Sequence, residues 1–134
     1  MIYLDSSIII RLIEGIDAVR TPIASRLQQI PETDRILITS RLSCLECQCK
    51  PIREKRGTLL ALYREFFASG AITLYELTVD VVERATIVRA ETGFKTPDAL
   101  HASTAILAKA DRFWTTDANF RKCSDLPLEI FPSV

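Results

Sequence analysis

The sequence predicts a three-layer α/β/α protein with a mostly parallel central sheet of about five strands. Short strand-like segments alternate with longer segments of helical periodicity, which is typical of parallel sheets covered by helices on both faces. A chain of 134 residues suits one domain and would bury about two-thirds of its unfolded surface. The 48% apolar and 25% charged residues are typical of a globular protein. We expect residues 1–134 to form a single domain.

The chain begins with a short strand and a helix. Residues 2–4 are apolar and are followed at once by an acid and two serines. Ser6 or Ser7 could accept a hydrogen bond from the first turn of a helix over residues 8–14. Gly15 would end that helix.

A second helix and a second strand follow. Apolar residues recur at helical spacing over residues 18–30, and Pro31 closes the stretch. Residues 35–39 are rich in β-branched and aliphatic side chains, which favours a strand. Ser40 would cap the next helix, over about residues 41–49.

The middle of the chain repeats this order. Residues 54–68 place apolar side chains on one side of a helix. Residues 72–75 alternate weakly and are typical of a strand, and a helix over residues 78–92 would stop at Gly93.

The last helix has a strong start signal in Thr96-Pro97-Asp98, which combines a cap, a proline at the first helical position and an acid in the first turn. We expect it to end near Ala110. Residues 112–115 then form a strand, residues 116–119 a loop, and residues 128–131 the final strand.

Charge and hydropathy exclude a membrane-spanning protein. The 17 basic and 17 acidic residues balance, and no apolar run approaches the ~20 residues that span a bilayer. The N-terminus meets an acid at once and lacks the basic region of a signal peptide. We therefore expect a cytoplasmic protein.

The four cysteines do not form a standard zinc pattern. Cys44, Cys47 and Cys49 lack the second ligand pair of a zinc ribbon, so a zinc site is the less favoured alternative. In a helix, Cys44 and Cys47 would share a face and Cys49 would turn away. We interpret them, with Cys123, as small core or half-buried thiols of a reducing compartment.

Four acids far apart in sequence fall near the carboxyl ends of predicted strands or in the first turns of helices there: Asp5, Glu46, Asp98 and Asp117. In an open α/β sheet this edge is the functional crevice. Asp5 could also be only a helix cap, Asp98 could only complement a helix dipole, and Asp117 could only stabilise a turn. Glu46 lies in a largely apolar stretch, so a solvated role fits it poorly.

Clustered carboxylates repel one another unless a cation neutralises them or some stay protonated. Oxygen ligands suit Mg²⁺ or Mn²⁺, and no histidine or cysteine lies at a spacing that favours zinc. Such ions activate water and stabilise the oxygens of phosphodiester cleavage. The residues therefore predict metal-dependent hydrolysis of a nucleic-acid backbone.

The motifs that carry these acids resemble those of a PIN domain, and more closely those of a VapC-type toxin ribonuclease. The resemblance spans the whole chain in order. It rests on Ile2-Tyr3-Leu4-Asp5-Ser6-Ser7, Ser40-Arg41-Leu42-Ser43-Cys44-Leu45-Glu46, Pro97-Asp98-Ala99-Leu100-His101-Ala102 and Trp114-Thr115-Thr116-Asp117-Ala118-Asn119-Phe120.

The resemblance implies that Asp5, Glu46, Asp98 and Asp117 are the acidic, metal-binding catalytic set. Supporting roles would fall to four residues: Ser6 or Ser7 beside Asp5, Thr116 as the hydroxyl before the last acid, and Asn119, where some relatives carry a further acid. Because an amide is a poorer Mg²⁺ ligand, Asn119 puts a second metal site in question.

The resemblance also implies an activity and partners. Family members are similar in being Mg²⁺- or Mn²⁺-dependent endoribonucleases that act on structured RNA, often tRNA or ribosomal RNA. They form homodimers, and a cognate antitoxin silences them by inserting a segment into the active-site groove.

The remaining candidates are basic or aromatic. We interpret His101 as a half-exposed helix residue near the groove, and Tyr3 and Trp114 as core residues. The candidates for contacts with RNA phosphates are Arg11, Lys50, Arg53, Arg56 and Arg121.

Two other function classes stay open. A catalytically degenerate PIN scaffold would bind RNA or a protein without cleavage. A receiver-type signalling domain is less favoured, because Asp5 stands alone at the first strand end and no lysine lies on or just before residues 128–131.

Overall fold

The computed structural model describes residues 1–132, which form five strands, six α-helices and two short 3₁₀ helices. In chain order the elements are β1 (Ile2–Leu4), α1 (Ser6–Glu14), α2 (Asp17–Gln29), η1 (Glu32–Asp34), β2 (Leu37–Ser40), α3 (Leu42–Arg53), α4 (Gly57–Ala68), β3 (Ile72–Tyr75), α5 (Val79–Thr92), α6 (Thr96–Leu107), β4 (Arg112–Thr115), η2 (Ala118–Lys122) and β5 (Leu128–Ile130).

The five strands form one sheet in the order β3-β2-β1-β4-β5, and every neighbouring pair is parallel. Strand β1 is central: the chain first builds outward through β2 to β3, then returns to add β4 and β5 on the other side of β1. The strand order therefore reverses between β1 and β4. In open α/β sheets, the crevice at the carboxyl ends of such strands is the usual ligand site.

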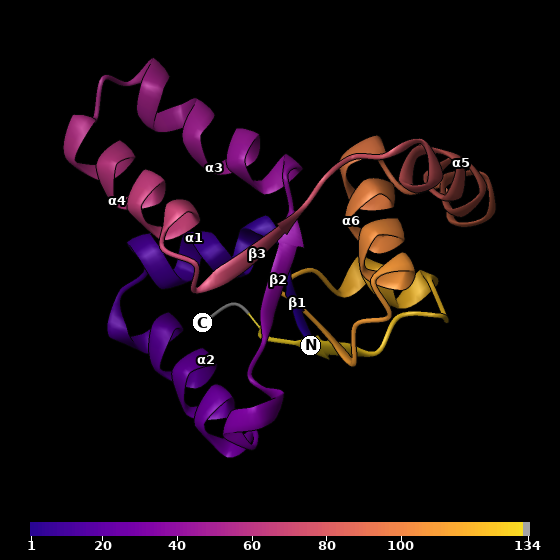
Figure 1. Ribbon diagram of the computed structural model, residues 1–134, viewed down its shortest axis with the longest axis horizontal. Helices are drawn as coiled ribbons and strands as arrows, with labels where there is room; N and C mark the ends of the chain where they lie inside the picture. Colours follow the sequence, from indigo (N-terminus) through magenta and orange to yellow (C-terminus); the bar gives the residue numbers. More distant parts are fainter. Residues whose placement is uncertain (133–134) are drawn as a thin grey trace.

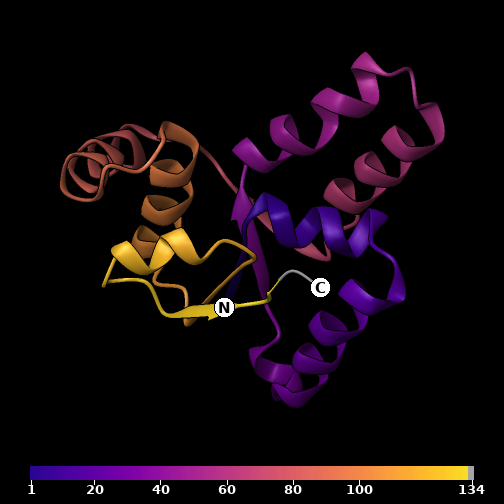
Figure 2. The ribbon, with the colours of Figure 1, turned by 180° about the vertical axis from the view of Figure 1, so that it is seen from behind.

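Helices cover both faces of the sheet, which confirms the predicted three-layer arrangement. Helices α1 to α4 lie on one side, and α5 and α6 lie on the other (Figure 1), and the reverse view shows the same division (Figure 2). The side-chain alternation of β1 explains how one strand serves both layers. Ile2 and Leu4 pack into the core under α1 to α4, whereas Tyr3 packs into the core under α5 and α6.

Two of the predicted helix caps differ from those in the structure. The predicted caps Ser6 and Ser7 are wrong, because Asp5 is the N-cap of α1 and its side chain accepts a hydrogen bond from the Ile8 amide. Helix α6 includes Thr96, whose predicted capping role is also not seen. Ser40 does accept a hydrogen bond from the Leu42 amide, so it stabilises the first turn of α3 as expected.

Several boundaries also differ: β2 begins at Leu37 rather than at residue 35, and α6 ends at Leu107 rather than near Ala110. Helix α3 runs past Pro51 to Arg53, and the next helix begins at Gly57 rather than at residue 54. Between them Lys55 has a left-handed φ of 55°. The chain reverses there, so the predicted helix over residues 54–68 loses its first turn. By contrast, α5 is capped by Thr78 and ends at Gly93, whose φ of 73° favours glycine.

Within the described residues, no helix combines the length and apolar character needed to cross a bilayer. The four thiols are free, with Cys47 and Cys123 buried, Cys44 half-buried and Cys49 exposed. The predicted orientation of the α3 cysteines is therefore confirmed, but the prediction that Cys49 is a core or half-buried thiol is wrong.

Candidate acidic site

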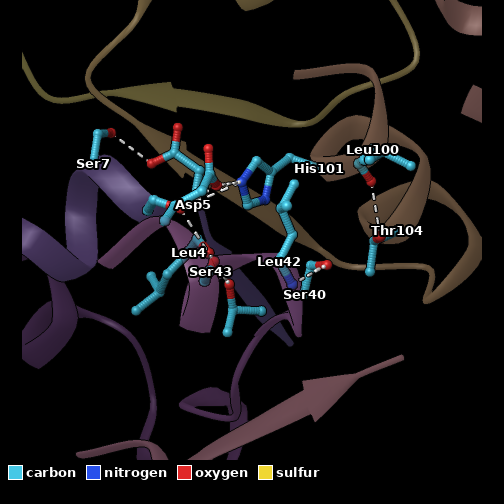
Figure 3. Close-up of polar contacts among 12 residues, drawn as sticks. Leu4, Asp5, Ser7, Ser40, Leu42, Ser43, Leu100, His101 and Thr104 are labelled. Atoms are coloured by element: carbon cyan, nitrogen blue, oxygen red, sulfur yellow. Dashed lines mark hydrogen bonds and ion pairs between the residues drawn. The ribbon is translucent and has the colours of Figure 1, made fainter. Parts of the chain in front are cut away.

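The four predicted acids all come from elements that end or begin at the carboxyl edge of the sheet. Asp5 follows β1, Asp117 follows β4, Glu46 lies in the second turn of α3, and Asp98 lies in the first turn of α6. Figure 3 shows Asp5 at the start of α1 with the His101 side chain reaching towards it from α6. The structure thus brings together segments that are up to about a hundred residues apart in sequence.

Asp5 is the most buried of these acids, with 5% exposure. Its Oδ1 accepts hydrogen bonds from the Ser7 hydroxyl and from the Ile8 amide, at 3.2 Å for the latter, and its Oδ2 accepts one from the Thr115 hydroxyl. Burial raises the pKa of Asp5 above its ordinary value, although these hydrogen bonds and the charge of His101 oppose the rise. Asp5 is therefore a helix cap and also a rigidly held carboxyl at the crevice.

Glu46 is half-buried and is held by two donors from other elements. Its Oε1 accepts a hydrogen bond from the Ser6 hydroxyl at 2.6 Å and contacts His101 Nε2 at 2.6 Å. Burial alone would raise the pKa of Glu46, but the hydrogen bond and charge of His101, with the Ser6 hydrogen bond, lower it overall. Glu46 thus stays ionised at neutral pH.

The prediction that His101 is half-exposed is wrong: it is 3% exposed and makes hydrogen bonds with both ring nitrogens. Its Nδ1 lies 2.7 Å from the Tyr3 hydroxyl. Tyr3 and Trp114 are fully buried, which confirms their core placement, but Tyr3 also contributes a polar contact beneath the site. The single histidine of the chain is therefore part of the acidic site rather than of its rim.

The pKa of Asp98 responds to the charges of the other three acids. Burial raises its pKa, the negative charge of Asp117 raises it further, and Asp5 and Glu46 add smaller contributions in the same direction. The charge of His101 opposes this rise. Because like charges shift a pKa only over short distances, all four carboxyl groups belong to one electrostatic neighbourhood.

The chemistry of this donor set fits a hard divalent cation, because the four acids and the hydroxyls around them offer only oxygen ligands. Among residues 1–132, however, no three side chains of His, Cys, Asp or Glu are already arranged to hold one ion. Asp117 is exposed at the start of η2, where its Oδ1 accepts a hydrogen bond from the Asn119 amide at 2.8 Å. The mutual repulsion of the acids opposes their closer approach until a cation binds.

The two serines after Asp5 support different acids. Ser7 donates to Asp5, and its oxygen accepts a hydrogen bond from the Thr116 amide at 3.1 Å. Ser6 instead donates to Glu46. Thr116 is thus placed by its backbone, and the hydroxyl that contacts an acid belongs to its neighbour Thr115.

Sequence reasoning missed Thr115, Ser43 and the role of His101. The Ser43 hydroxyl lies 2.7 Å from that of Thr39 and 3.4 Å from that of Ser6, so a chain of hydroxyls runs beneath Glu46. A usable signal was present for Thr115, which is the polar last residue of an otherwise apolar strand that ends at the site. For His101, the signal was its spacing of three residues from Asp98, which puts both on one side of α6.

The basic candidates divide into three groups. The Arg11 guanidinium donates to the backbone carbonyls of Phe131 and Pro132, so it holds the C-terminal segment. Lys50 and Arg56 line a cavity of about 180 Å³ that Glu46 also lines. Arg53 and Arg121 are exposed.

Comparison with known proteins agrees with this architecture. The family model described as "PIN domain" matches residues 2–126. No curated protein matches the sequence.

Several solved structures share the fold. One is a toxin–antitoxin complex from Klebsiella pneumoniae, with a TM-score of 0.76 at 20% identity over 100% of both chains. Another is VapBC2 from Rickettsia felis bound to a promoter DNA fragment, with a TM-score of 0.77 at 19% identity over 98% of this chain and 99% of that one. A third is the sarcin–ricin-loop-cleaving toxin VapC20 from Mycobacterium tuberculosis, with a TM-score of 0.71 at 19% identity over 90% and 93% of the two chains.

At these identities the structural likeness establishes the fold, and the family match, which spans nearly the whole chain, establishes the relationship. The parallel sheet, its reversal point beside β1 and the acids at that point are all in keeping with this match. The chain belongs to the PIN domain family.

Proposed function

We propose that this protein is a Mg²⁺- or Mn²⁺-dependent endoribonuclease that hydrolyses RNA phosphodiester bonds, and that it acts as the toxin of a type II toxin–antitoxin module. The observation that carries the proposal is the placement of four sequence-remote acids at the crevice of a PIN fold, where the charges of Asp117, Asp5 and Glu46 all raise the pKa of Asp98. Repulsion among clustered carboxylates destabilises a fold, so a cluster of this kind favours a role in binding a cation.

In this proposal Asp5, Glu46, Asp98 and Asp117 hold the cation. When bound, the cation neutralises the acids, promotes ionisation of water and stabilises charge on the phosphate. Asp5 supplies a fixed point, because it is buried and its two oxygens accept three hydrogen bonds.

The basic side chains extend this site towards a substrate. Lys50 and Arg56, which share a cavity with Glu46, would contact RNA phosphates beside the cleaved bond. Arg53 and Arg121 are further candidates, exposed on the surface. Arg11 contributes less in this view, because its guanidinium already binds the C-terminal backbone.

The proposed partners come from the relatives. Similar structures are described as toxin–antitoxin complexes, and one similar toxin is described as cleaving the sarcin–ricin loop. By analogy we propose a cognate antitoxin, a homodimeric toxin, and a structured substrate such as tRNA or ribosomal RNA. The protein would act in the cytoplasm, where its thiols stay reduced.

The test is cleavage of a structured RNA by the purified protein, with Mg²⁺ or Mn²⁺ and with excess EDTA. Asp98→Asn removes one proposed ligand with little change in size and is expected to lower cleavage at least about a hundredfold. Asp80→Asn is the matched control, because Asp80 also lies in the first turn of a helix but is exposed on α5. Equal cleavage in EDTA, or an active Asp98→Asn variant, would contradict the proposal.

The alternative function is a PIN scaffold that binds RNA or a protein without cleavage. It is favoured by one observation: across residues 1–132, no three acidic side chains are set around a single ion position. Calorimetric titration with Mn²⁺ separates the two. A dissociation constant weaker than about 1 mM, which corresponds to about 4 kcal/mol of binding free energy, would favour the scaffold.

A further inference from the structure

A buried polar chain connects the core of the sheet to Glu46. It runs from the Tyr3 hydroxyl on β1 to Nδ1 of His101 on α6 at 2.7 Å, and from Nε2 of His101 to Oε1 of Glu46 on α3 at 2.6 Å. Tyr3 is 0% exposed and His101 is 3% exposed, so water does not compete for these contacts. Three elements that meet only in the folded protein are therefore joined through one imidazole ring.

The hydrogen-bonding groups of Glu46 and Tyr3 limit which imidazole nitrogen must carry a proton. An ionised carboxylate only accepts hydrogen bonds, so the short contact with Glu46 requires a proton on Nε2. A phenol can donate or accept, so the Tyr3 hydroxyl can pair with Nδ1 whether or not that nitrogen also carries a proton. Tyr3 also stacks on Phe113, with ring centroids 5.0 Å apart and planes inclined by 6°, which fixes the direction of its hydroxyl.

The hydrogen bonds around Glu46 fix the orientation of its carboxylate. Its Oε1 receives two donors, the Ser6 hydroxyl and His101 Nε2, both at 2.6 Å. The hydrogen bonds of residues 1–132 leave Oε2 without a donor. A carboxylate held by one oxygen in this way has a fixed orientation, and its second oxygen is available to a ligand.

We propose that His101 is a positioning residue: with its ring held by Tyr3, it donates from Nε2 to Glu46 Oε1 and presents Glu46 Oε2 to the divalent cation. The inference rests on the proposed function, because it assigns to Glu46 the role of a metal ligand. It assigns His101 no contact with the cation or with RNA. Hydrogen-bond partners of metal ligands commonly contribute tenfold to hundredfold in metal affinity.

The first measurement locates the imidazole proton by ¹⁵N NMR of the untagged, metal-free protein. Because His101 is the only histidine, the imidazole signals need no residue assignment, and their couplings to the carbon-bound ring protons distinguish Nδ1 from Nε2. We expect Nε2 to carry a proton in the parent protein, because the ionised Glu46 carboxylate needs a donor at that nitrogen. A ring whose Nε2 lacks a proton in the parent would overturn the proposal.

The second measurement is the affinity for Mn²⁺ by calorimetry. Tyr3→Phe keeps the stacked ring and removes only the hydroxyl, and His101→Leu removes both ring nitrogens. We expect each to weaken Mn²⁺ binding about tenfold. His101→Gln, whose amide can place a donor at the position of Nε2, is expected to restore binding towards the parent value.

The matched control is Tyr75→Phe, which removes a phenol hydroxyl whose partner is the Met1 sulfur at 3.7 Å. Circular dichroism and thermal unfolding establish that each variant is folded, and Tyr3→Phe decides the question if His101→Leu does not fold. Parent-like Mn²⁺ affinity in the folded variants would overturn the positioning role and leave the proposed function intact. A parent protein that binds no Mn²⁺ would instead refute the proposed function itself, and the positioning role with it.

Discussion

The substitution Thr115→Val tests how the buried carboxyl of Asp5 is stabilised. Thr115 is 0% exposed at the end of β4, and its hydroxyl donates to Asp5 Oδ2 and accepts a hydrogen bond from the Asp117 amide at 3.1 Å. Valine keeps the β-branched shape and removes only the hydroxyl. The change therefore isolates two hydrogen bonds without opening a cavity.

The expected cost follows from these contacts. A hydrogen bond to a charged group contributes about 1.5–3 kcal/mol, and its loss leaves a buried acceptor under-satisfied. The Asp117 amide lies at an exposed residue, where water can replace the lost acceptor, so it adds little. We expect the free energy of unfolding to fall by about 2 kcal/mol. Because the Thr115 hydrogen bond lowers the pKa of Asp5, that pKa should also rise in the variant.

Urea unfolding followed by fluorescence measures this cost. Trp114 is the only tryptophan and is 1% exposed, so its emission reports directly on the core beside Thr115. With a slope of about 2 kcal/mol/M, a loss of 2 kcal/mol lowers the urea midpoint by about 1 M.

Thr104→Val is the matched control. Thr104 is equally buried, at 1% exposure, but its hydroxyl donates to the Leu100 carbonyl of its own helix, as Figure 3 shows. That carbonyl keeps its helical hydrogen bond, so we expect a loss of at most about 1 kcal/mol. Equal losses in the two variants would refute the view that Thr115 stabilises the charge of Asp5.

Three further predictions follow from the electrostatics and burial. Asp5→Asn keeps the helix cap and should stabilise the protein near neutral pH: because burial raises the folded-state pKa of Asp5 above 3.8, ionisation disfavours the fold. The advantage of the variant should appear as pH rises above about 3.8 and vanish below it, which urea unfolding at several pH values will show. Asp117→Asn should lower the pKa of Asp98, because the charge of Asp117 helps to raise it; ¹³C NMR of the carboxyl groups would measure this, and an unchanged pKa would place Asp117 outside the site. In the folded protein Cys49 should react with a thiol reagent much faster than the buried Cys47, so labelling that Cys49→Ser does not slow would contradict the assigned orientation of α3.

Much of the fold follows from local patterns that the sequence states directly. Alternating apolar segments predict the strands, and Gly93 and the Thr96-Pro97-Asp98 start mark helix ends where the structure has them within a residue or so. The exceptions are positions where the path of the chain between elements, rather than the local sequence pattern, decides a residue's role. Asp5 replaces the serines as the cap of α1, because the chain leaves β1 with its carboxylate directed at the first turn of the helix.

In the candidate site, too, some features could be predicted from the sequence and others depend on the tertiary structure. The placement of the four acids near one another could be predicted, because chain order alone brings the ends of parallel strands to one edge of the sheet. The partners of those acids could not, because hydrogen bonds depend on directions that spacing does not fix. Ser6 and Ser7 are adjacent, yet the helical rotation of about 100° between them sends one to Glu46 and the other to Asp5.

By itself, then, the sequence determined the element order, the parallel three-layer fold and the placement of the four acids at one edge of the sheet, since these depend on periodicity and chain order. Only the tertiary structure decided that His101 is buried between Tyr3 and Glu46 and that the Thr115 hydroxyl holds Asp5. The physical reason is that such contacts join side chains from different elements, and their geometry is set by how those elements pack.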